Sequence, residues 1–350
     1  MDTPVLGFGI VGCGMVANYH AKALSHAVGG RLIGVAERSA DKAKRFAERH
    51  GVPYWTTSVD ELMRRSDIDV VCIATPSGVH MEPALAAIRA GKHIVVEKPL
   101  EITVERIDQV LRASEIAGVK VAAIFPARFG PGARALKAAV DARRFGRLAL
   151  CSAYIKWYRK PEYYQDSWHG SLALDGGGAL MNQGIHAIDL LQWLAGMPVE
   201  VSAFKTRRLH VGIEAEDTAV AVVRFPDGAL GSVEGSTAAY PGFKRRIEIC
   251  GEKGSAVLED DHLIRWEFRE PAEGDAQTAA AGSRGEEMQS GAGAPDKISY
   301  HGHLLQLQDL IDSIRENRPP FVDGRESRNA VALIRAIYAS AESGAPVSLL

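Results

Sequence analysis

The chain has 350 residues, of which 46% are hydrophobic and 24% are charged, and its formal net charge is -2. This composition is typical of a globular protein and excludes a disordered or fibrous chain, and the length predicts two domains. Because no basic block is present to neutralise phosphates, nucleic acid is not an expected partner.

The start of the chain lacks the basic stretch, apolar segment and cleavage site of a signal peptide. No apolar run approaches the roughly 18 residues of a membrane-spanning helix. We therefore expect a cytoplasmic protein that does not contact a membrane. Cysteines stand at positions 13, 72, 151 and 250 without a CxxC pair, so neither a disulfide framework nor a metal site is expected.

The first third of the chain alternates short apolar runs, rich in Val and Ile, with amphipathic segments. Strands are predicted at 5–11, 31–36, 70–74, 93–96 and 120–124. Such runs, separated by helices, are typical of a parallel sheet that is covered on both faces. Residues 1–125 are therefore predicted to form an α/β domain, a doubly wound Rossmann fold that binds a dinucleotide.

Residues 126–350 are predicted to form a second, α+β domain with a largely antiparallel open sheet, because short turns join several of its strands. Its strands are predicted at 147–158, 201–209, 217–225, 230–237, 244–250 and 255–259. Its helices are predicted at 133–142, 179–194, 302–317 and 324–343, and the two C-terminal helices are able to pack back on the first domain. Segment 274–296, rich in Gly, Ala, Ser and Gln, is predicted to be a mobile surface loop without an assigned function.

A glycine-rich turn follows the first predicted strand. Residues 12–17, GCGMVA, match the dinucleotide fingerprint G-x-G-x-x-A and open a helix. Gly12 permits the tight turn, and Gly14 lets the backbone approach the pyrophosphate, which lies on the helix N-terminus with Met15 and Val16 in its first turn. A second match at 7–12 lies inside the strand and is rejected.

Glu37 ends the second predicted strand, 23 residues after Gly14. Its carboxylate can accept hydrogen bonds from the adenosine ribose and would repel a 2'-phosphate, which favours NAD over NADP. The neighbouring Arg38 can stack on adenine or bind a phosphate, so it is included among the cofactor-binding residues.

Two further motifs lie at the carboxyl ends of predicted strands, where open α/β sheets bind ligands. They are residues 74–80, ATPSGVH, and 97–99, EKP. With the fingerprint, the turn and helix at 175–189 (DGGGALMNQGIHAID) and the ending at 321–347, they resemble the family of glucose-fructose oxidoreductase, inositol dehydrogenase and rhizopine catabolism proteins (Gfo/Idh/MocA). The resemblance covers nearly the whole chain.

The resemblance implies an NAD(P)-dependent dehydrogenase whose second domain binds substrate and forms homodimers or homotetramers through its sheet. It implies that Lys98 and His186 face the reacting carbon. The remaining cofactor residues that it suggests are Thr75, Pro76, His80 and Glu97. For His80 two positions are open: beside the nicotinamide or its ribose, or as a cap of the following helix.

Oxidation of a secondary alcohol needs a base for the hydroxyl proton, and Lys98 or His186 can fill that role. On a continuous helix, Asn182, His186 and Asp189 would share one stripe. Many members of the family have an aspartate where this chain has Asn182, which can orient a hydroxyl but cannot be a base. Three arrangements stay open: His186 acts alone, Asp189 orients it, or Lys98 takes the proton.

The predicted strand at 147–158 ends in aromatic and basic residues and is the expected sugar-binding surface. Aromatic rings pack against the C–H faces of sugars, and cations bind anionic groups. An aromatic sheet surface used for packing or subunit contact is the alternative. Asp175 is expected either to cap a helix or to bind substrate. The predicted substrate-binding residues are Arg128, Tyr158, Arg159, Trp168 and Asp189.

The sequence thus predicts hydride transfer between NAD and a secondary alcohol or ketone of a sugar, inositol or nucleotide-linked sugar. One alternative is a reductase of a non-sugar substrate on the same fold, of the dihydrodiol or tetrapyrrole type. The other is a catalytically silent NAD-binding sensor, which Asn182 keeps open.

Overall fold

The computed structural model describes residues 5–165, 167–282 and 299–349, and the chain divides into two compact units. The first unit comprises Met1–Pro126 and Tyr300–Arg328, and the second comprises Ala127–Ser299 and Asn329–Leu350. A late segment of the chain therefore belongs to the first unit, while the last residues belong to the second.

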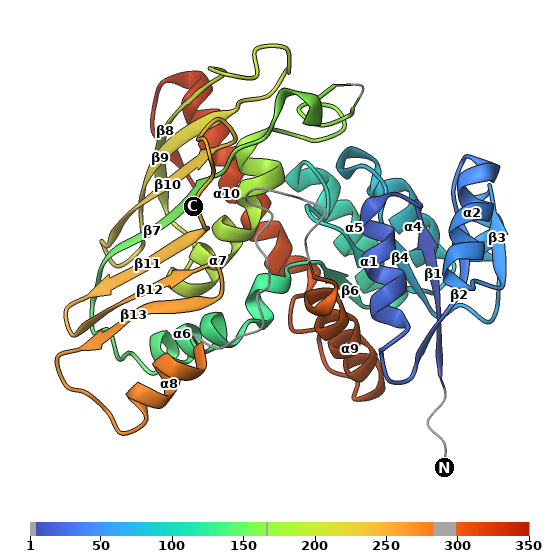
Figure 1. Ribbon diagram of the computed structural model, residues 1–350, viewed down its shortest axis with the longest axis horizontal. Coiled ribbons are helices and arrows are strands. Elements are labelled where there is room, and N and C mark those ends of the chain that lie inside the picture. The colour runs from blue at the N-terminus through green and yellow to red at the C-terminus, as the bar shows by residue number, and fades with distance from the viewer. Residues whose placement is uncertain (1–4, 166, 283–298, 350) are drawn as a thin grey trace. The chain divides into compact units, whose positions relative to one another are not determined.

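The first unit contains a six-stranded sheet in the order β3-β2-β1-β4-β5-β6, in which every pair of neighbouring strands is parallel (Figure 1). The strands are β1 (Leu6–Val11), β2 (Gly30–Ala36), β3 (Tyr54–Thr56), β4 (Val70–Ile73), β5 (His93–Val96) and β6 (Val121–Ala123). The predicted Rossmann fold is confirmed. Strand β3 has only three residues, which is too short for an alternating or apolar pattern to reveal it in the sequence.

Helices accompany these strands, and three of them begin at side-chain caps. They are α1 (Met15–Leu24), α2 (Ala40–His50), α3 (Val59–Met63), α4 (Met81–Arg89), α5 (Val104–Ala117) and α9 (His301–Arg315), with a 3-10 turn η1 (Ser77–Val79). Ser39, Ser58 and Thr103 cap α2, α3 and α5 by accepting a backbone N–H. Each cap satisfies a donor that the first helical turn leaves free.

The core of the first unit joins segments that are far apart in the sequence. Phe8 and Ile10 of β1 are fully buried and belong to the same cluster as Leu307, Leu310 and Ile311 of α9. Burial of each such side chain is worth about 1.5–3 kcal/mol, so this packing holds α9 in the first unit.

The second unit contains an eight-stranded sheet in the order β13-β12-β11-β7-β10-β9-β8-β14 (Figure 1). The strands are β7 (Leu148–Lys156), β8 (Glu200–Thr206), β9 (Thr218–Arg224), β10 (Leu230–Ser236), β11 (Arg246–Gly251), β12 (Gly254–Glu259), β13 (His262–Phe268) and β14 (Val347–Ser348). All neighbours are antiparallel except β7 and β10, which are parallel. The predicted largely antiparallel sheet is confirmed, and β13 and β14 are additional strands.

One face of this sheet is covered by helices. They are α6 (Pro131–Asp141), α7 (Ile185–Ala195) and α10 (Gly324–Ser343), with α7 preceded by the π-helical turn η4 (Ala179–Gly184). Along β9, Ala219, Ala221 and Val223 are buried, whereas Val220 and Val222 are exposed. This alternation means that no described segment of the chain covers the other face of the sheet.

The predicted surface loop at 274–296 is partly wrong, because residues Asp275–Gly282 form helix α8. Asp275 accepts hydrogen bonds from Arg144 and from the indole of Trp266, and these long-range contacts favour a helix that composition did not indicate. The rest of that segment, from 283 on, lies outside the described residues.

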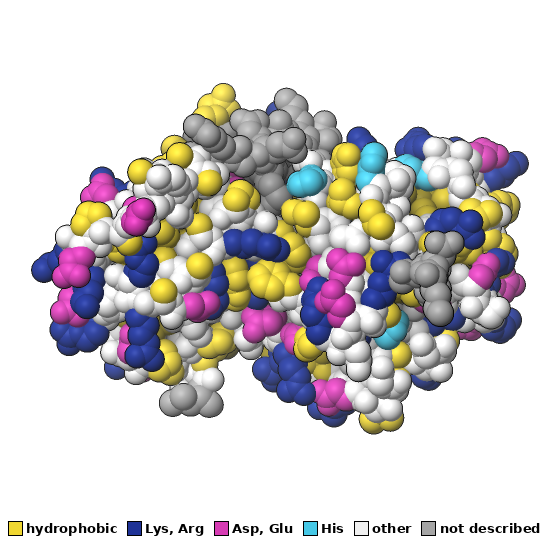
Figure 2. Space-filling model, turned by 90° about the horizontal axis from the view of Figure 1, so that it is seen from below, with side chains coloured by type: hydrophobic (Ala, Val, Ile, Leu, Met, Phe, Trp, Pro, Cys, Tyr) yellow, Lys and Arg dark blue, Asp and Glu magenta, His cyan; other side chains and the backbone are white. Residues whose placement is uncertain are grey.

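No helix in the described ranges combines the length and the hydropathy that a membrane span requires. On the face shown in Figure 2, acidic and basic side chains are interspersed, and neither sign forms a continuous patch.

Candidate functional site

The turn after β1 has the form that a bound pyrophosphate requires. Gly12 has φ +92°, and a Cβ there would lie 2.6 Å from the Ala74 carbonyl oxygen, so glycine is needed. Gly14 is the N-cap of α1, and a Cβ built on it meets no atom within 4 Å. The first turn of α1 has no acidic residue and no side-chain cap. Its free N–H groups therefore suit an anion.

Glu37 lies directly beside this turn. Its Oε2 accepts the Cys13 backbone N–H at 3.0 Å, and its Oε1 accepts the Ser39 N–H at 3.4 Å. The carboxylate is thus fixed at the end of β2, next to the glycine-rich turn, where it is placed to accept a ribose hydroxyl.

We expect the protein to bind NADH more tightly than NADPH, with a Kd ratio of roughly ten or more, equivalent to about 1.4 kcal/mol. Glu37→Ser should narrow this ratio, because it removes a negative charge that repels a 2'-phosphate. Calorimetric titration of both cofactors measures the effect, and Glu48→Ser, in an exposed position on α2, is the matched control. Tighter binding of NADPH by the wild-type protein would contradict the assignment.

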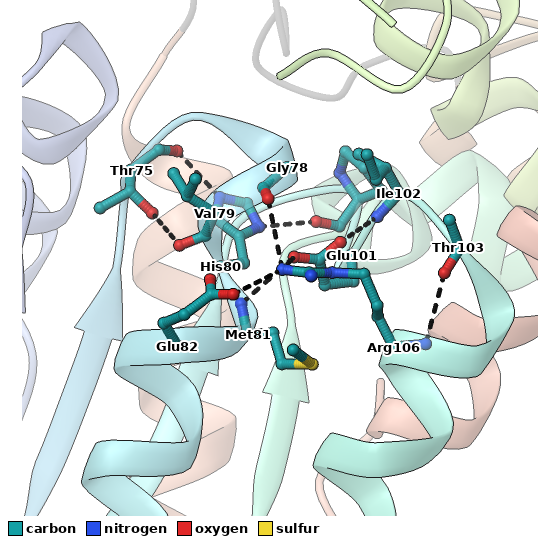
Figure 3. A network of polar contacts seen from close by, with 11 residues as sticks. Thr75, Gly78, Val79, His80, Met81, Glu82, Glu101, Ile102, Thr103 and Arg106 are labelled. Carbon is teal, nitrogen blue, oxygen red and sulfur yellow. Dashed lines mark hydrogen bonds and ion pairs between the residues drawn. The ribbon is translucent and has the colours of Figure 1, made fainter. Parts of the chain in front are cut away.

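His80 joins the two loops that follow β4 and β5 (Figure 3). Its Nδ1 lies 2.9 Å from the Pro99 carbonyl oxygen and its Nε2 lies 2.9 Å from that of Thr75. The residue is the N-cap of α4, but its side chain makes no capping hydrogen bond, so the alternative of a side-chain cap has no support here. Both ring nitrogens lie against protein carbonyls, so we propose that His80 acts on the loops rather than through a polar contact to the cofactor.

A buried carboxylate fixes the second loop to α4 and α5 (Figure 3). Glu101 accepts the Met81 N–H at 3.3 Å, the Ile102 N–H at 2.7 Å and the Arg106 guanidinium at 2.9 Å. Arg106 also contacts Glu82 at 2.9 Å. The two carboxylates raise the pKa of Arg106, chiefly through the hydrogen bond to Glu101. These contacts therefore fix the loops after β4 and β5 to helices α4 and α5.

Glu97 and Lys98 lie where β5 ends. Lys98 is half-buried and precedes Pro99 through a cis peptide bond. Glu97 is buried and accepts Nε2–H of His20 at 2.8 Å and of His303 at 3.1 Å. Burial alone would raise the pKa of Glu97, but these two hydrogen bonds outweigh it and hold the pKa well below its usual range.

Among the described residues, His20, Glu97 and His303 are the one group close enough together to hold a metal ion, with ligand atoms within 4.8 Å of one another. A histidine that binds a metal usually donates its second ring N–H to a neighbouring acceptor. Here Nδ1 of His20 and of His303 has no hydrogen-bond partner among the described residues. We therefore interpret the group as a hydrogen-bonded cluster.

In the second unit, Asn182 points to Asp175. Its Nδ2 donates to both carboxylate oxygens of Asp175, at 2.8 and 3.0 Å, and lies 3.4 Å from Nδ1 of His169. Asp175 is buried and also accepts the Gly170 N–H at 2.9 Å. Asp175 therefore holds a loop and Asn182, and these contacts are neither a helix cap nor a substrate contact.

His186 is half-buried in the first turn of α7. The predicted continuous helix through 179–194 is wrong in its first six residues, because η4 is a π-helix. A π-helical turn contains more residues than an α-helical one, so the predicted stripe of Asn182, His186 and Asp189 is interrupted. π-helical turns are frequent at functional sites.

Arg128 and Asp189 form an ion pair in the protein interior. Arg128 Nε and Nη2 donate to the two oxygens of Asp189 at 2.8 and 2.6 Å, and the side chains are 1% and 0% exposed. The guanidinium also lies over the Trp193 ring at 5.2 Å. Both were predicted to bind substrate, but each charge is neutralised by the other, as a buried charge requires. We therefore remove both from the substrate site.

The aromatic and basic cluster gathers around Tyr163. The His169 ring stacks on it at 4.4 Å with an interplanar angle of 2°, and the Arg159 guanidinium lies 5.5 Å from its centroid. The Trp168 ring lies 4.1 Å from that of His169. Burial lowers the pKa of Arg159, which is 5% exposed. Three predicted residues, Arg159, Trp168 and Asn182, thus belong to one cluster.

Tyr158, the other aromatic residue predicted to bind substrate, has its ring 5.3 Å from that of Tyr240, which is 78% exposed. It does not share the contacts around Tyr163. His169, His20 and His303 were not predicted from the sequence. Their partners lie far along the chain or in a loop, so no spacing pattern indicated them.

Comparison with known proteins identifies the chain. The model of an oxidoreductase family with an NAD-binding Rossmann fold, Gfo/Idh/MocA, matches residues 6–125, and the model of that family's C-terminal domain matches 133–257. The chain belongs to the Gfo/Idh/MocA oxidoreductases. The predicted family and the predicted NAD cofactor are both confirmed.

The similar proteins with solved structures include two WlbA dehydrogenases, each in complex with NADH and UDP-GlcNAcA. The Bordetella pertussis protein is 31% identical with a TM-score of 0.90, covering 100% of this chain and 99% of that one. The Chromobacterium violaceum protein is 33% identical with a TM-score of 0.88, covering 100% and 97%. Among curated relatives, the myo-inositol 2-dehydrogenase of Thermotoga maritima is 26% identical over 97% of this chain and 98% of its own.

Proposed function

We propose that this oxidoreductase transfers a hydride between NAD and a secondary alcohol of a nucleotide-linked sugar that carries an acidic group. The observation that carries the proposal is the full-length similarity to two WlbA dehydrogenases bound to UDP-GlcNAcA, at 31% and 33% identity. The inositol dehydrogenase of T. maritima matches over a similar length at 26% identity.

The substrate is assigned to the second unit. The Arg159 guanidinium lies 5.2 Å from the centroid of the Trp157 ring and 5.5 Å from that of Tyr163. Arginine suits planar carboxylates and phosphates, and aromatic rings suit sugar C–H faces. This combination supports a sugar with an anionic group more than an uncharged inositol. Lys156, by contrast, already pairs with Glu234 at 2.8 Å.

The chemistry requires hydride transfer and proton transfer at one carbon. NAD, when bound, accepts the hydride. Lys98 is proposed to lie at the hydroxyl oxygen and stabilise the negative charge that develops there, and His186 to take the proton. Asn182, held by Asp175, is proposed to orient a substrate hydroxyl, since an amide cannot act as the base.

Substrate screening tests this function. With NAD present, UDP-GlcNAcA should give NADH at 340 nm, with a higher kcat/KM than UDP-GlcNAc, which lacks the carboxylate, or than myo-inositol. Arg159→Met should reduce this preference, because it removes the cation. Preference for myo-inositol would contradict the substrate class. NAD binding without turnover on any sugar, inositol or nucleotide sugar would favour the silent sensor.

We also propose that the protein forms a homodimer or homotetramer through the uncovered face of its sheet. Phe204 is opposite Val220 across β8 and β9, and Val222 lies two residues further along β9. Their exposed fractions are 83%, 45% and 59%. Adjacent exposed apolar side chains on a sheet are typical of a protein interface.

Val222→Glu should shift the protein toward monomer, because association would bury an unpaired charge. Sedimentation or light scattering at several concentrations measures the shift. Ile116→Glu, at an 89% exposed position of α5 in the other unit, is the matched control. A wild-type protein that is monomeric at micromolar concentration would refute the proposal.

A further inference from the structure

Three buried histidines hold the two residues that flank Lys98. His20 and His303 contact the side chain of Glu97, which precedes the lysine, and His80 contacts the carbonyl of Pro99, which follows it. The exposed fractions of the three histidines are 0%, 5% and 1%. None of them is adjacent to Lys98 in the sequence, and none is assigned to proton transfer.

On the amino side of the lysine, the cluster fixes a carboxylate that in turn holds the lysine backbone. Glu97 Oε1 accepts both Nε2–H groups, and Oε2 accepts the Lys98 N–H at 3.3 Å. The Glu97 N–H donates to the Ile73 carbonyl at 3.0 Å, which ties the same residue to β4. The Glu97 side chain and backbone are thus held from three elements, α1, α9 and β4.

On the carboxyl side, His80 forms a bridge between two carbonyl oxygens. A carbonyl accepts but cannot donate, so a ring nitrogen forms a hydrogen bond with its carbonyl only when it carries the proton. A neutral imidazole has only one N–H and can satisfy only one of the two. Because Nδ1 is the atom at Pro99 and Nε2 is the atom at Thr75, the two contacts can be removed separately.

We infer that His20, His303 and His80 are positioning residues that set the place of the Lys98 ammonium by fixing the backbone on both sides of it. The inference rests on the proposed function, in which Lys98 meets the substrate oxygen. A reacting group displaced by about 1 Å can lose roughly 10²-fold in rate, so a lysine on a flexible stem needs a rigid base.

Paired substitutions test the histidine contacts on each side of Lys98. Asparagine places its amide near the position of a histidine Nδ1, and glutamine near that of Nε2. His80→Asn should therefore keep the Pro99 contact and most of kcat, whereas His80→Gln should keep only the Thr75 contact and lose roughly tenfold to 10²-fold. By the same reasoning, His303→Gln should keep the Glu97 contact, and His303→Leu should lose kcat.

The readouts separate positioning from folding. The loss should lie in kcat, with the Kd for NADH and the KM for NAD within about twofold of wild type, at temperatures well below each variant's Tm. His93→Gln is the matched control, because His93 begins β5 at the end opposite to Lys98 and accepts the Lys120 N–H at 2.9 Å. It should leave kcat unchanged.

Several outcomes would overturn the inference. They are equal kcat for His80→Asn and His80→Gln, a lowered Tm with wild-type kcat in His303→Leu, and one metal ion bound per chain through the cluster. Lys98→Met distinguishes this failure from that of the proposed function. If Lys98→Met retains turnover, the proposed role of the lysine fails and the inference with it. If Lys98→Met is inactive but the histidine variants have wild-type kcat, the inference alone fails.

Discussion

Lys98→Met should lower kcat by roughly 10² to 10⁴ while leaving the affinity for NADH nearly unchanged. Methionine keeps the length of the side chain but removes the ammonium that is proposed to meet the substrate oxygen. The glycine-rich turn and Glu37, which are assigned to the dinucleotide, are joined to each other through the Cys13 N–H. Steady-state kinetics and calorimetric titration with NADH measure the two effects separately.

Lys92→Met is a matched control for removing a lysine from the same unit, because the Lys92 ammonium donates to the Arg65 and Ile68 carbonyls. That variant should lose stability but, once folded, keep its kcat. A folded Lys98→Met protein with nearly normal kcat would remove the lysine from the mechanism. A raised Kd for NADH alone would make Lys98 a cofactor-binding residue.

His186→Ala should also lower kcat by roughly 10² to 10⁴, the usual contribution of a positioned general base. The structure suggests a sharper test than Asn182→Asp alone. That single change would place a second carboxylate against Asp175, whose Oδ1 lies 2.8 Å from the present Asn182 Nδ2. Two carboxyl groups at this distance do not both ionise.

The double variant Asp175→Asn with Asn182→Asp preserves the amide–carboxylate pair but moves the charge onto residue 182, one turn before His186. We propose that this carboxylate lies nearer to His186 than that of Asp175 does; a nearer carboxylate favours the imidazolium, so more of the histidine would be protonated at a given pH. The acidic limb of the pH–rate profile for oxidation should therefore move to higher pH. If that limb stays in place in the double variant and disappears only in Lys98 variants, the lysine and not His186 takes the proton.

The features that could be predicted from the sequence are those that depend on residues close together in the chain. The glycine-rich turn, Glu37 and the strands of the parallel sheet follow from short patterns, because a turn with φ +92° and a fully buried strand each restrict the residues that can occupy them. The strands of the second sheet were indicated by alternation and turns, although β13 and the two-residue β14 were not. The pattern of β13 mixes exposed and half-buried positions around one buried leucine, Leu263.

Polar partners at long range were decided by tertiary structure alone. Arg128 and Asp189 each fit a substrate site by residue type, and only their separation of 61 residues, closed by the fold, shows that they neutralise each other. His303 meets Glu97 across 206 residues of chain. Asn182 was placed on a stripe with His186, but η4 is π-helical and turns its amide to Asp175.

The sequence by itself determined the family, the Rossmann fold, the dinucleotide turn and the cofactor, because these depend on backbone conformation and spacing within a few residues. Only the tertiary structure decided which polar side chains are engaged in the interior and which remain for chemistry. A buried charge or donor must find a partner, and that partner is set by packing between distant segments, which no local pattern records.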